Sequence, residues 1–163
     1  MLKTIRKVWY KMALRQIVKD TDPQIRKHSR EVTSFDKKLA TLLDDMRETM
    51  LKNDGVGLAG IQVGILRRVA VVETSEDFFR ELINPVILEQ KGEQEGIEGC
   101  LSVDNYNCYV IRPNEIKLKY FDRYGVEHVE VVTGFDARAC CHEIDHMDGI
   151  LFKDKCSKEI SYR

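Results

Sequence analysis

Two histidines four residues apart constrain the fold of this chain more than any other feature. They enclose the segment 142–146, which reads HEIDH. In an α-helix, residues i and i+4 lie on one face, so the imidazoles of His142 and His146 converge on one point. Glu143 lies one step around the helix, from where its carboxylate can reach a water bound at that point. The segment therefore predicts a helix that holds a metal ion and supports hydrolysis, although two unrelated histidines can also fall four residues apart by chance.

A third ligand must come from elsewhere, because two histidines do not complete a metal site. The upstream candidate is Cys100, in the segment 98–102 with the sequence EGCLS. The glycine before it permits close backbone approach, and a thiol that binds a metal is deprotonated and a strong ligand. A set of one cysteine and two histidines leaves one tetrahedral position open for water. Taken alone, Cys100 is more simply explained as a small buried side chain.

The segment 55–64, GVGLAGIQVG, contains four glycines among small apolar residues. This composition predicts a backbone held close to another group, and Gln62 offers an amide donor for a polar ligand. The segment lacks the GxxxxGK[ST] order of a phosphate-binding loop. A tight turn between a helix and a strand is the simpler alternative.

The hydrophobic pattern predicts an α+β fold. Apolar residues at helical spacing indicate a helix over residues 35–52, opened by a capping box from Thr33 to Asp36. A second helix is expected at about residues 134–148, with Thr133 and Asp136 as its capping box. Between them lie strand-like apolar runs, at residues 69–72, 82–84, 110–111, 116–120 and 129–132. Because strands and helices do not alternate, we expect a mixed or antiparallel sheet packed around the HExxH helix, with an N-terminal helix.

Composition limits the remaining classes. A length of 163 residues fits one domain, and the formal net charge of −1 gives no sign of a specific nucleic-acid surface. No apolar run approaches the roughly 18 residues that a membrane-spanning helix needs. The five cysteines are odd in number and irregularly spaced, which does not indicate a disulfide framework. Without a visible secretory signal, we expect the chain in the reducing cytoplasm, away from membranes.

The three segments, taken in order, resemble the motifs GxGLAAxQ, EGCLS and HExDH of the peptide deformylase family. The resemblance extends from about residue 14 to residue 154, so residues 1–13 stand as an N-terminal extension of unassigned role within a single catalytic domain, 1–163. Gly60 replaces an alanine of the family, and we expect it to loosen a strand beside the site. Ile61 stands where proline or another residue is common. Cys141 replaces the usual glutamine, which predicts the loss of a hydrogen bond around the metal.

The resemblance implies an enzyme that removes the formyl group from the N-terminal formylmethionine of new polypeptides, releasing formate. It assigns one divalent metal ion to Cys100, His142 and His146. Iron(II) is the expected native metal, with zinc, nickel or cobalt as substitutes. Glu143 would take a proton from the attacking water and pass it to the leaving amine. The backbone N–H of Leu101 and the side-chain amide of Gln62 would stabilise the oxyanion.

Further residues are expected to contact the substrate. The resemblance implies backbone pairing by Val56 and Gly57 with an extended peptide, and it adds Glu98 to the substrate-binding set. Helix geometry places Phe135 and Ala139 on roughly the same stripe as His142, where they can wall the methionine pocket or simply pack in the core. In addition, we expect Asp145 to pair with Arg112, with a solvated carboxylate as the alternative.

The substrate sets the expected partners and the competing interpretations. N-formylmethionyl peptides imply transient proximity to the ribosome, although the tail 153–163 is short and mixed in charge. A peptidase of the HExxH type is one alternative. It would need a downstream third ligand, and Glu159 is the only glutamate after His146. A catalytically silent, deformylase-like metal-binding protein is the other. Retention of Glu143 and Gln62 argues against it, because a closed structural site needs neither.

Overall fold

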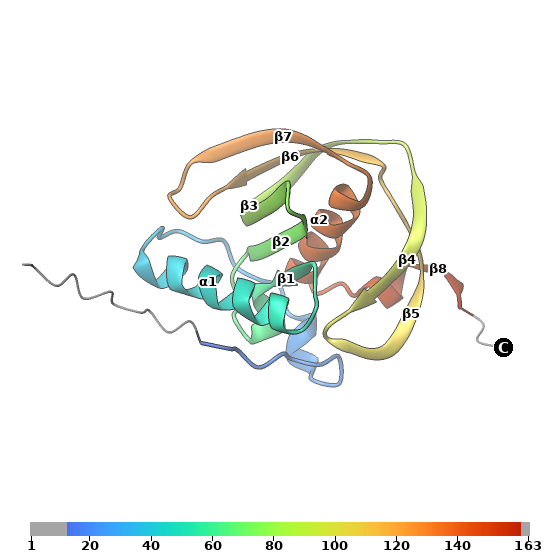
Figure 1. Cartoon of the computed structure of the whole chain (residues 1–163), viewed down its shortest axis with the longest axis horizontal. Helices are drawn as coiled ribbons and strands as arrows, with labels where there is room; N and C mark the ends of the chain where they lie inside the picture. Colours follow the sequence, from blue (N-terminus) through green and yellow to red (C-terminus); the bar gives the residue numbers. More distant parts are fainter. Residues whose placement is uncertain (1–12, 161–163) are drawn as a thin grey trace, which may run out of the picture.

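Two antiparallel sheets and two α-helices make up residues 13–160, the part of the chain that the computed structural model describes (Figure 1). The larger sheet has five strands in the order β1-β2-β3-β6-β7, and these are Gly57–Ala59, Val69–Ser75, Phe78–Lys91, Glu115–Phe121 and Glu127–Thr133. The smaller sheet has the order β4-β5-β8, formed by Gln94–Cys100, Val103–Arg112 and Cys156–Glu159. The helix α2, Gly134–Met147, lies between the two sheets in Figure 1. The α+β class with antiparallel pairing is confirmed.

The five-stranded sheet is covered on both faces, and the pattern of β2 shows why. Four consecutive residues, Val69–Val72, are fully buried. Successive side chains of a strand point to opposite faces. Val69 and Val71 accordingly pack into a cluster with the apolar residues of α1, Lys37–Lys52, whereas Ala70 and Val72 join the cluster that contains α2. Continuous burial of this strand therefore fixes one helix on each face.

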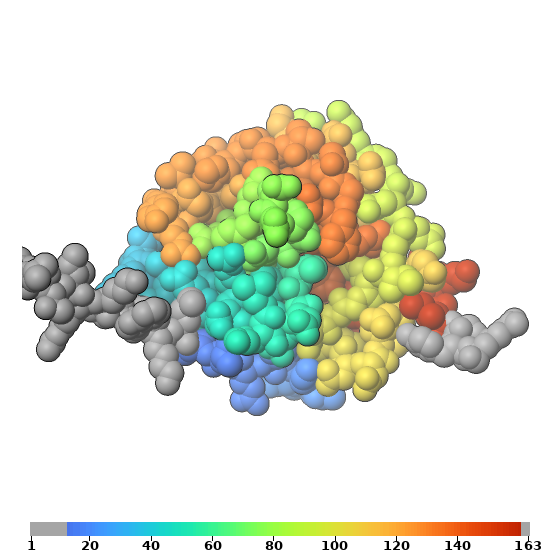
Figure 2. All heavy atoms as spheres, in the orientation of Figure 1, coloured from blue at the N-terminus to red at the C-terminus, as the bar shows by residue number. Residues whose placement is uncertain are grey.

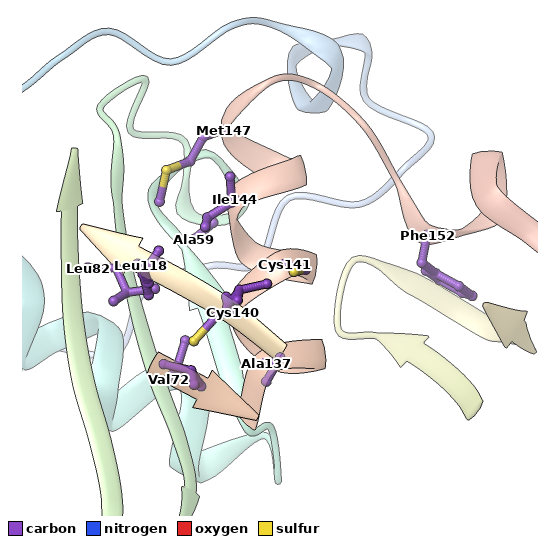
Figure 3. Packing of buried hydrophobic residues seen from close by; sticks show 14 of the residues in the cluster. Ala59, Val72, Leu82, Leu118, Ala137, Cys140, Cys141, Ile144, Met147 and Phe152 are labelled. Carbon is purple, nitrogen blue, oxygen red and sulfur yellow. The ribbon is translucent and has the colours of Figure 1, made fainter. Parts of the chain in front are cut away.

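The helix α2 packs one side onto this sheet. Ala137, Cys140, Ile144 and Met147 lie on the face that meets Val72, Leu82 and Leu118 in Figure 3. All of these residues are buried, and every one except Ile144 is fully buried. The opposite side of α2 consequently points toward the smaller sheet, and it carries the two histidines of the HEIDH segment.

Both helix starts differ from the expected capping boxes. The helix α1 begins at Lys37, and its N-cap is Asp36, whose carboxylate accepts from the backbone N–H of Leu39 at 3.0 Å. The expected box from Thr33 to Asp36 is therefore wrong by one turn. In α2, Thr133 is the N-cap but makes no side-chain capping bond. The Asp136 carboxylate, expected to complete the box, accepts instead from the Thr74 hydroxyl of β2.

Three short 3-10 helices also lie within residues 13–160, at Pro23–Arg26 (η1), Gly60–Val63 (η2) and Phe152–Lys155 (η3). Each apolar run expected to form a strand lies within β2, β3, β5, β6 or β7. The sequence pattern missed β4, because its residues QEGIEGC mix glycine with charge, and it missed the short strands β1 and β8. The proposed N-terminal extension lies outside the described residues except for its last residue, Ala13. No helix in residues 13–160 is both long and apolar enough to cross a membrane.

Candidate active site

A cavity of about 320 Å³ opens between α2, the segment before β1 and the end of β4. Figure 2 shows the teal surface at the end of α1 beside the yellow surface of the smaller sheet, and residues of both regions line the cavity. Of the residues expected to act in the site, His146 alone is not among those that line the cavity. The three motif segments, far apart in sequence, thus meet at one place.

The thiol and the two imidazoles converge at the inner end of this cavity. Cys100 is the last residue of β4, and both histidines belong to α2. Cys100 Sγ lies 3.3 Å from His146 Nε2, which lies 3.2 Å from His142 Nε2. One ligand atom from each residue falls within 4.8 Å of the other two. The structure therefore brings together the three residues expected to bind a metal.

The remaining nitrogen of His142 is fixed by a buried carboxylate. His142 Nδ1 lies 2.7 Å from Glu98 Oε1, and this contact leaves Nε2 facing Cys100 and His146. Burial alone would raise the pKa of Glu98, but hydrogen bonds from Arg112 and His142 outweigh it and hold the pKa well below its usual range. Burial also disfavours the charged form of His142 and by itself would lower the pKa of its imidazole. The contacts of His142 with Cys100 and Glu98 outweigh burial and raise that pKa to about 10. The contacts with Glu98 and Cys100 therefore favour positive charge on His142, in the form of a proton that a bound metal would replace.

His146 differs from its partner. Burial, together with the charge of His142, lowers the pKa of its imidazole well below the usual value, so the ring is neutral. A neutral imidazole is the form that binds a metal. Nearby Cys141 is buried, and burial raises the pKa of its thiol to about 11, so it stays protonated at neutral pH.

Glu143 presents a buried carboxylate beside this group. Burial raises its pKa to about 7, the range that suits a group that both accepts and returns protons at neutral pH. Within residues 13–160, its Oε2 is one of three buried polar side-chain atoms without a hydrogen-bond partner, and His146 Nδ1 is another. Gly57 of β1 faces this carboxylate, and a Cβ at that position would clash with it. The glycine-rich segment thus does hold backbone close to another group.

Gln62 is held in one orientation in η2. Its Oε1 accepts from the backbone N–H of Ala59 at 2.9 Å, and its Nε2 donates to Ser102 Oγ at 3.1 Å. The same Nε2 lies 3.4 Å from Cys100 Sγ, so the amide donor faces the cavity end where the ligands meet. Gly60 lies in η2 and not in a strand, directly after β1, and it is buried there.

The expected substrate contacts lie at the cavity wall. Val56 and Phe135 are exposed at its rim, with exposed fractions of 40% and 54%, whereas Ala139 is buried. Leu101 follows Cys100 and is half-buried. Glu98 also borders the cavity, but its carboxylate oxygens already accept from Arg112, Arg138 and His142, which differs from the direct substrate contact expected of it.

The pair between Asp145 and Arg112 is confirmed. Arg112 and Arg138 both donate to Glu98, and this part of the buried network was not predicted from the sequence. The sequence could have indicated Arg138 as a neighbour of the site. It lies four residues before His142, and residues at that spacing share one face of a helix.

A thiol and two imidazoles that converge beside a buried glutamate define the site of a metal-dependent hydrolase. Comparison with known proteins agrees. The chain matches the family model for polypeptide deformylase over residues 14–161. A peptide deformylase of Caldanaerobacter subterraneus is 51% identical over 146 residues, which cover 88% of this chain and 90% of that protein. Peptide deformylase 1 of Bacillus subtilis is 50% identical, over 90% of this chain and 92% of that protein.

A solved structure is similar as well. The crystal structure of peptide deformylase from Thermotoga maritima matches with a TM-score of 0.87 and 38% sequence identity, over 89% of this chain and 99% of that chain. The chain therefore belongs to the polypeptide deformylase family. It is an enzyme that removes the N-formyl group from nascent peptides, in a family that depends on a metal. The comparisons favour this activity over the HExxH peptidase.

Proposed function

We propose that the enzyme hydrolyses N-formylmethionyl peptides to formate and a free amine in the cavity beside α2, with one divalent metal ion held by Cys100, His142 and His146. The observation that carries this proposal is the convergence of one thiol and two imidazole Nε2 atoms next to the buried Glu143 carboxylate. The site suits a cation because Glu98 lies behind His142 and the thiol becomes an anion when it binds metal.

The metal supplies one kind of chemistry when it is bound: it lowers the pKa of a water molecule to about 7, so that hydroxide is available at neutral pH. A thiolate with two imidazoles suits iron(II) or zinc. We propose iron(II) as the native metal, with zinc, nickel or cobalt as substitutes. Elemental analysis after anaerobic purification tests this choice.

Glu143 is proposed to move the proton. Its Oε2 has no partner among the described residues and is available to accept a proton from the attacking water. Its raised pKa, about 7, lets the same oxygen return that proton to the leaving amine. A well-placed acid or base of this kind contributes about 10²–10⁴ to a rate.

Gln62 and Leu101 are proposed to bind the formyl oxygen. As negative charge develops on that oxygen, it needs donors that are already in place. Gln62 Nε2 is fixed by the bonds that its amide makes to Ala59 and Ser102. The backbone N–H of Leu101 follows directly on Cys100 and is the second donor that we propose.

The peptide is proposed to lie along β1. This strand is at the edge of the five-stranded sheet, so an extended peptide can pair with its outer side near Val56 and Gly57. Phe135 and Ala139 of α2 would wall the methionine side chain. We assign Glu98 to holding His142 instead of contacting the peptide, because its oxygens are occupied.

The setting of the enzyme is also part of the proposal. We propose that residues 1–163 form a single catalytic domain that acts in the cytoplasm, where it meets new chains close to the ribosome. The near-neutral net charge, −1, supports a role without a specific nucleic-acid or membrane partner.

Formate release from formyl-Met-Ala-Ser tests the activity and the role of Glu143 together. We expect metal-replete Glu143→Ala to lose at least about 10²-fold in turnover, with its metal content unchanged, because the proton acceptor is lost. Glu89→Ala, on an exposed position of β3, is the matched control and should keep full activity. Full turnover by Glu143→Ala would contradict its role, and cleavage of internal peptide bonds without formate would contradict the activity.

A further inference from the structure

Arg138 connects α2 to the smaller sheet through a buried set of hydrogen bonds. Its side chain is only 5% exposed. Nη1 donates to Glu98 Oε2 at 2.7 Å and to the Val110 carbonyl at 3.0 Å, and Nη2 donates to the Gln94 carbonyl at 3.2 Å. One guanidinium from the helix thus binds two strands, β4 and β5, together with the carboxylate that orients His142.

Gly96 makes room for this guanidinium. Gly96 and Val110 are directly opposite each other in the pairing of β4 with β5, and the Arg138 head group lies against this pair. A Cβ at Gly96 would lie 3.0 Å from Nη2 and 3.1 Å from Cζ, closer than packed side chains normally approach. The φ angle of Gly96 is not positive, so the arginine, and not backbone conformation, accounts for the glycine.

The contact between Arg138 and Gly96 lies at the same sequence separation, four residues, from a proposed ligand on each of the two elements. His142 lies four residues after Arg138 on α2, and Cys100 lies four residues after Gly96 on β4. The Arg138–Gly96 contact therefore fixes the position of α2 relative to β4 close to the point where each element carries a proposed ligand. A shift of the helix along the strand would change the separation of Cys100 and His142.

Glu98 connects the same arginine to the imidazole. Its Oε2 accepts from Arg138 and Arg112, and its Oε1 accepts from Arg112 and lies 2.7 Å from His142 Nδ1. Without Arg138, Oε2 keeps only the bond from Arg112 Nε at 2.9 Å, so the carboxylate is held from the Arg112 side alone and can tilt toward it. Because His142 Nδ1 contacts Oε1, a tilt of the carboxylate would change the orientation of the His142 ring relative to the other proposed ligands.

We propose that Arg138 is a positioning residue for the metal site, which sets the separation of α2 and β4 and the orientation of His142 through Glu98. This proposal rests on the proposed binding of a metal by Cys100, His142 and His146. Partners that orient a metal ligand typically change metal affinity by about 10–100-fold when they are removed. Arg138 should act on affinity in that range although it touches no metal.

Metal affinity of the full-length apo-protein, measured with Co²⁺ against a competing chelator, provides the test. We expect Arg138→Met to bind Co²⁺ about 10–100-fold more weakly and Arg138→Lys to fall between it and the wild type, because lysine keeps the charge without the fork of donors. Arg80→Met is the matched control, since Arg80 pairs with Glu130 away from the cavity, and it should bind like the wild type. An unchanged affinity of Arg138→Met, even with a lower melting temperature, would overturn the proposal.

Two more variants separate positioning from folding. Gly96→Ala keeps the arginine but pushes its guanidinium off β4, so we expect it to weaken Co²⁺ binding in the same direction. In a Glu98→Gln background, Arg138→Met should add less than about a threefold loss, because residues that act through one network are not additive. If Arg138→Met does not fold, Arg138→Lys and Gly96→Ala decide the question, and wild-type affinity in both would overturn the proposal. A wild-type protein that binds no Co²⁺ would instead overturn the proposed metal site itself.

Discussion

At the scale of single residues, Gln62 and Leu101 are both proposed to donate a hydrogen bond to the formyl oxygen, one from its side chain and the other from its backbone. Gln62 acts through its side-chain amide, whose Oε1 and Nε2 are both held by protein groups. Leu101 acts through a backbone N–H, which any residue except proline supplies. The two positions should therefore respond differently to truncation.

We expect Gln62→Ala to lower kcat for formyl-Met-Ala-Ser by about 10²–10³, the usual cost of losing one donor to an oxyanion. Leu101→Ala should lose less than about tenfold, because its N–H remains. Steady-state formate release, with metal content measured on each variant, checks both values. Equal losses in the two variants would contradict this division of roles.

The convergence of the two histidines and Glu143 could be predicted from the sequence because helical spacing alone places these three residues together. His142, Glu143 and His146 need only the 3.6-residue period to share a site. Glu98 could not be assigned in this way, since its partners Arg112 and Arg138 come from other elements, and only the packed structure shows that its oxygens are occupied. The position of Cys100 followed from the motif and not from any spacing to the histidines.

At the scale of elements, the same contrast applies to strands and short helices. The run 69–72 predicted β2 because a strand buried on both faces needs continuous apolar residues. The strand β4 escaped prediction because Gly96 and Gly99 have roles set by tertiary contacts: a Cβ at Gly96 would meet Arg138, and one at Gly99 would meet Asn107. Its local sequence therefore carries little strand propensity.

The 3-10 helix η2 gives a stability prediction at Gly60, where the family usually has alanine. A Cβ at Gly60 would lie 3.0 Å from the Ile65 carbonyl oxygen and from Val69 Cγ2, and 3.1 Å from the Arg67 carbonyl oxygen. Alanine would gain about 0.4–1 kcal/mol by restricting the unfolded chain, but overpacking costs about 1–3 kcal/mol. We therefore expect Gly60→Ala to be destabilised by about 1 kcal/mol in urea unfolding. A variant as stable as the wild type would show that the backbone around Ile65 moves aside.

Three strands of the larger sheet meet at one carboxylate. Glu130 of β7 accepts from Arg80 of β3 at 3.1 Å and from the Tyr120 hydroxyl of β6 at 2.8 Å. Burial raises the pKa of Glu130, but the bonds from Arg80 and Tyr120 outweigh it, and the net pKa is lowered. A carboxyl whose pKa is lower in the folded state stabilises the protein above its unfolded pKa of about 4.3.

This contribution should disappear in acid. As the pH falls through the folded pKa of Glu130, the carboxylate is protonated and its contribution to the free energy of unfolding is lost. We expect wild type to be more stable than Glu130→Gln at pH 6, with the difference shrinking as the pH falls below the unfolded pKa of about 4.3 in urea unfolding. Glu127→Gln, exposed on the same strand, serves as the control and should follow the wild type. A difference that grows in acid would contradict this assignment.

At the scale of the whole molecule, the proposed metal joins the two sheets. The helix α2 packs its apolar side on the five-stranded sheet, and two proposed ligands lie on its other side. The third, Cys100, ends a strand of the three-stranded sheet. A metal bound by all three therefore links the two halves of the fold at the point where the apolar contacts give way to the buried charges of Glu98 and Arg112.

Removal of the metal should consequently destabilise the entire fold and not the site alone. A ligand that binds only the folded state contributes about 4.1 kcal/mol when its concentration is 1,000 times its Kd. For a chain of this size each kcal/mol corresponds to about 2–4 °C in Tm, so we expect a chelator to lower the Tm by roughly 8–16 °C. Differential scanning calorimetry of metal-replete and chelated protein measures the shift. Cys100→Ser is the control, because a site with one ligand replaced by a weaker one should lose most of the shift. An equal shift in that variant would place the stabilising metal somewhere other than between α2 and β4.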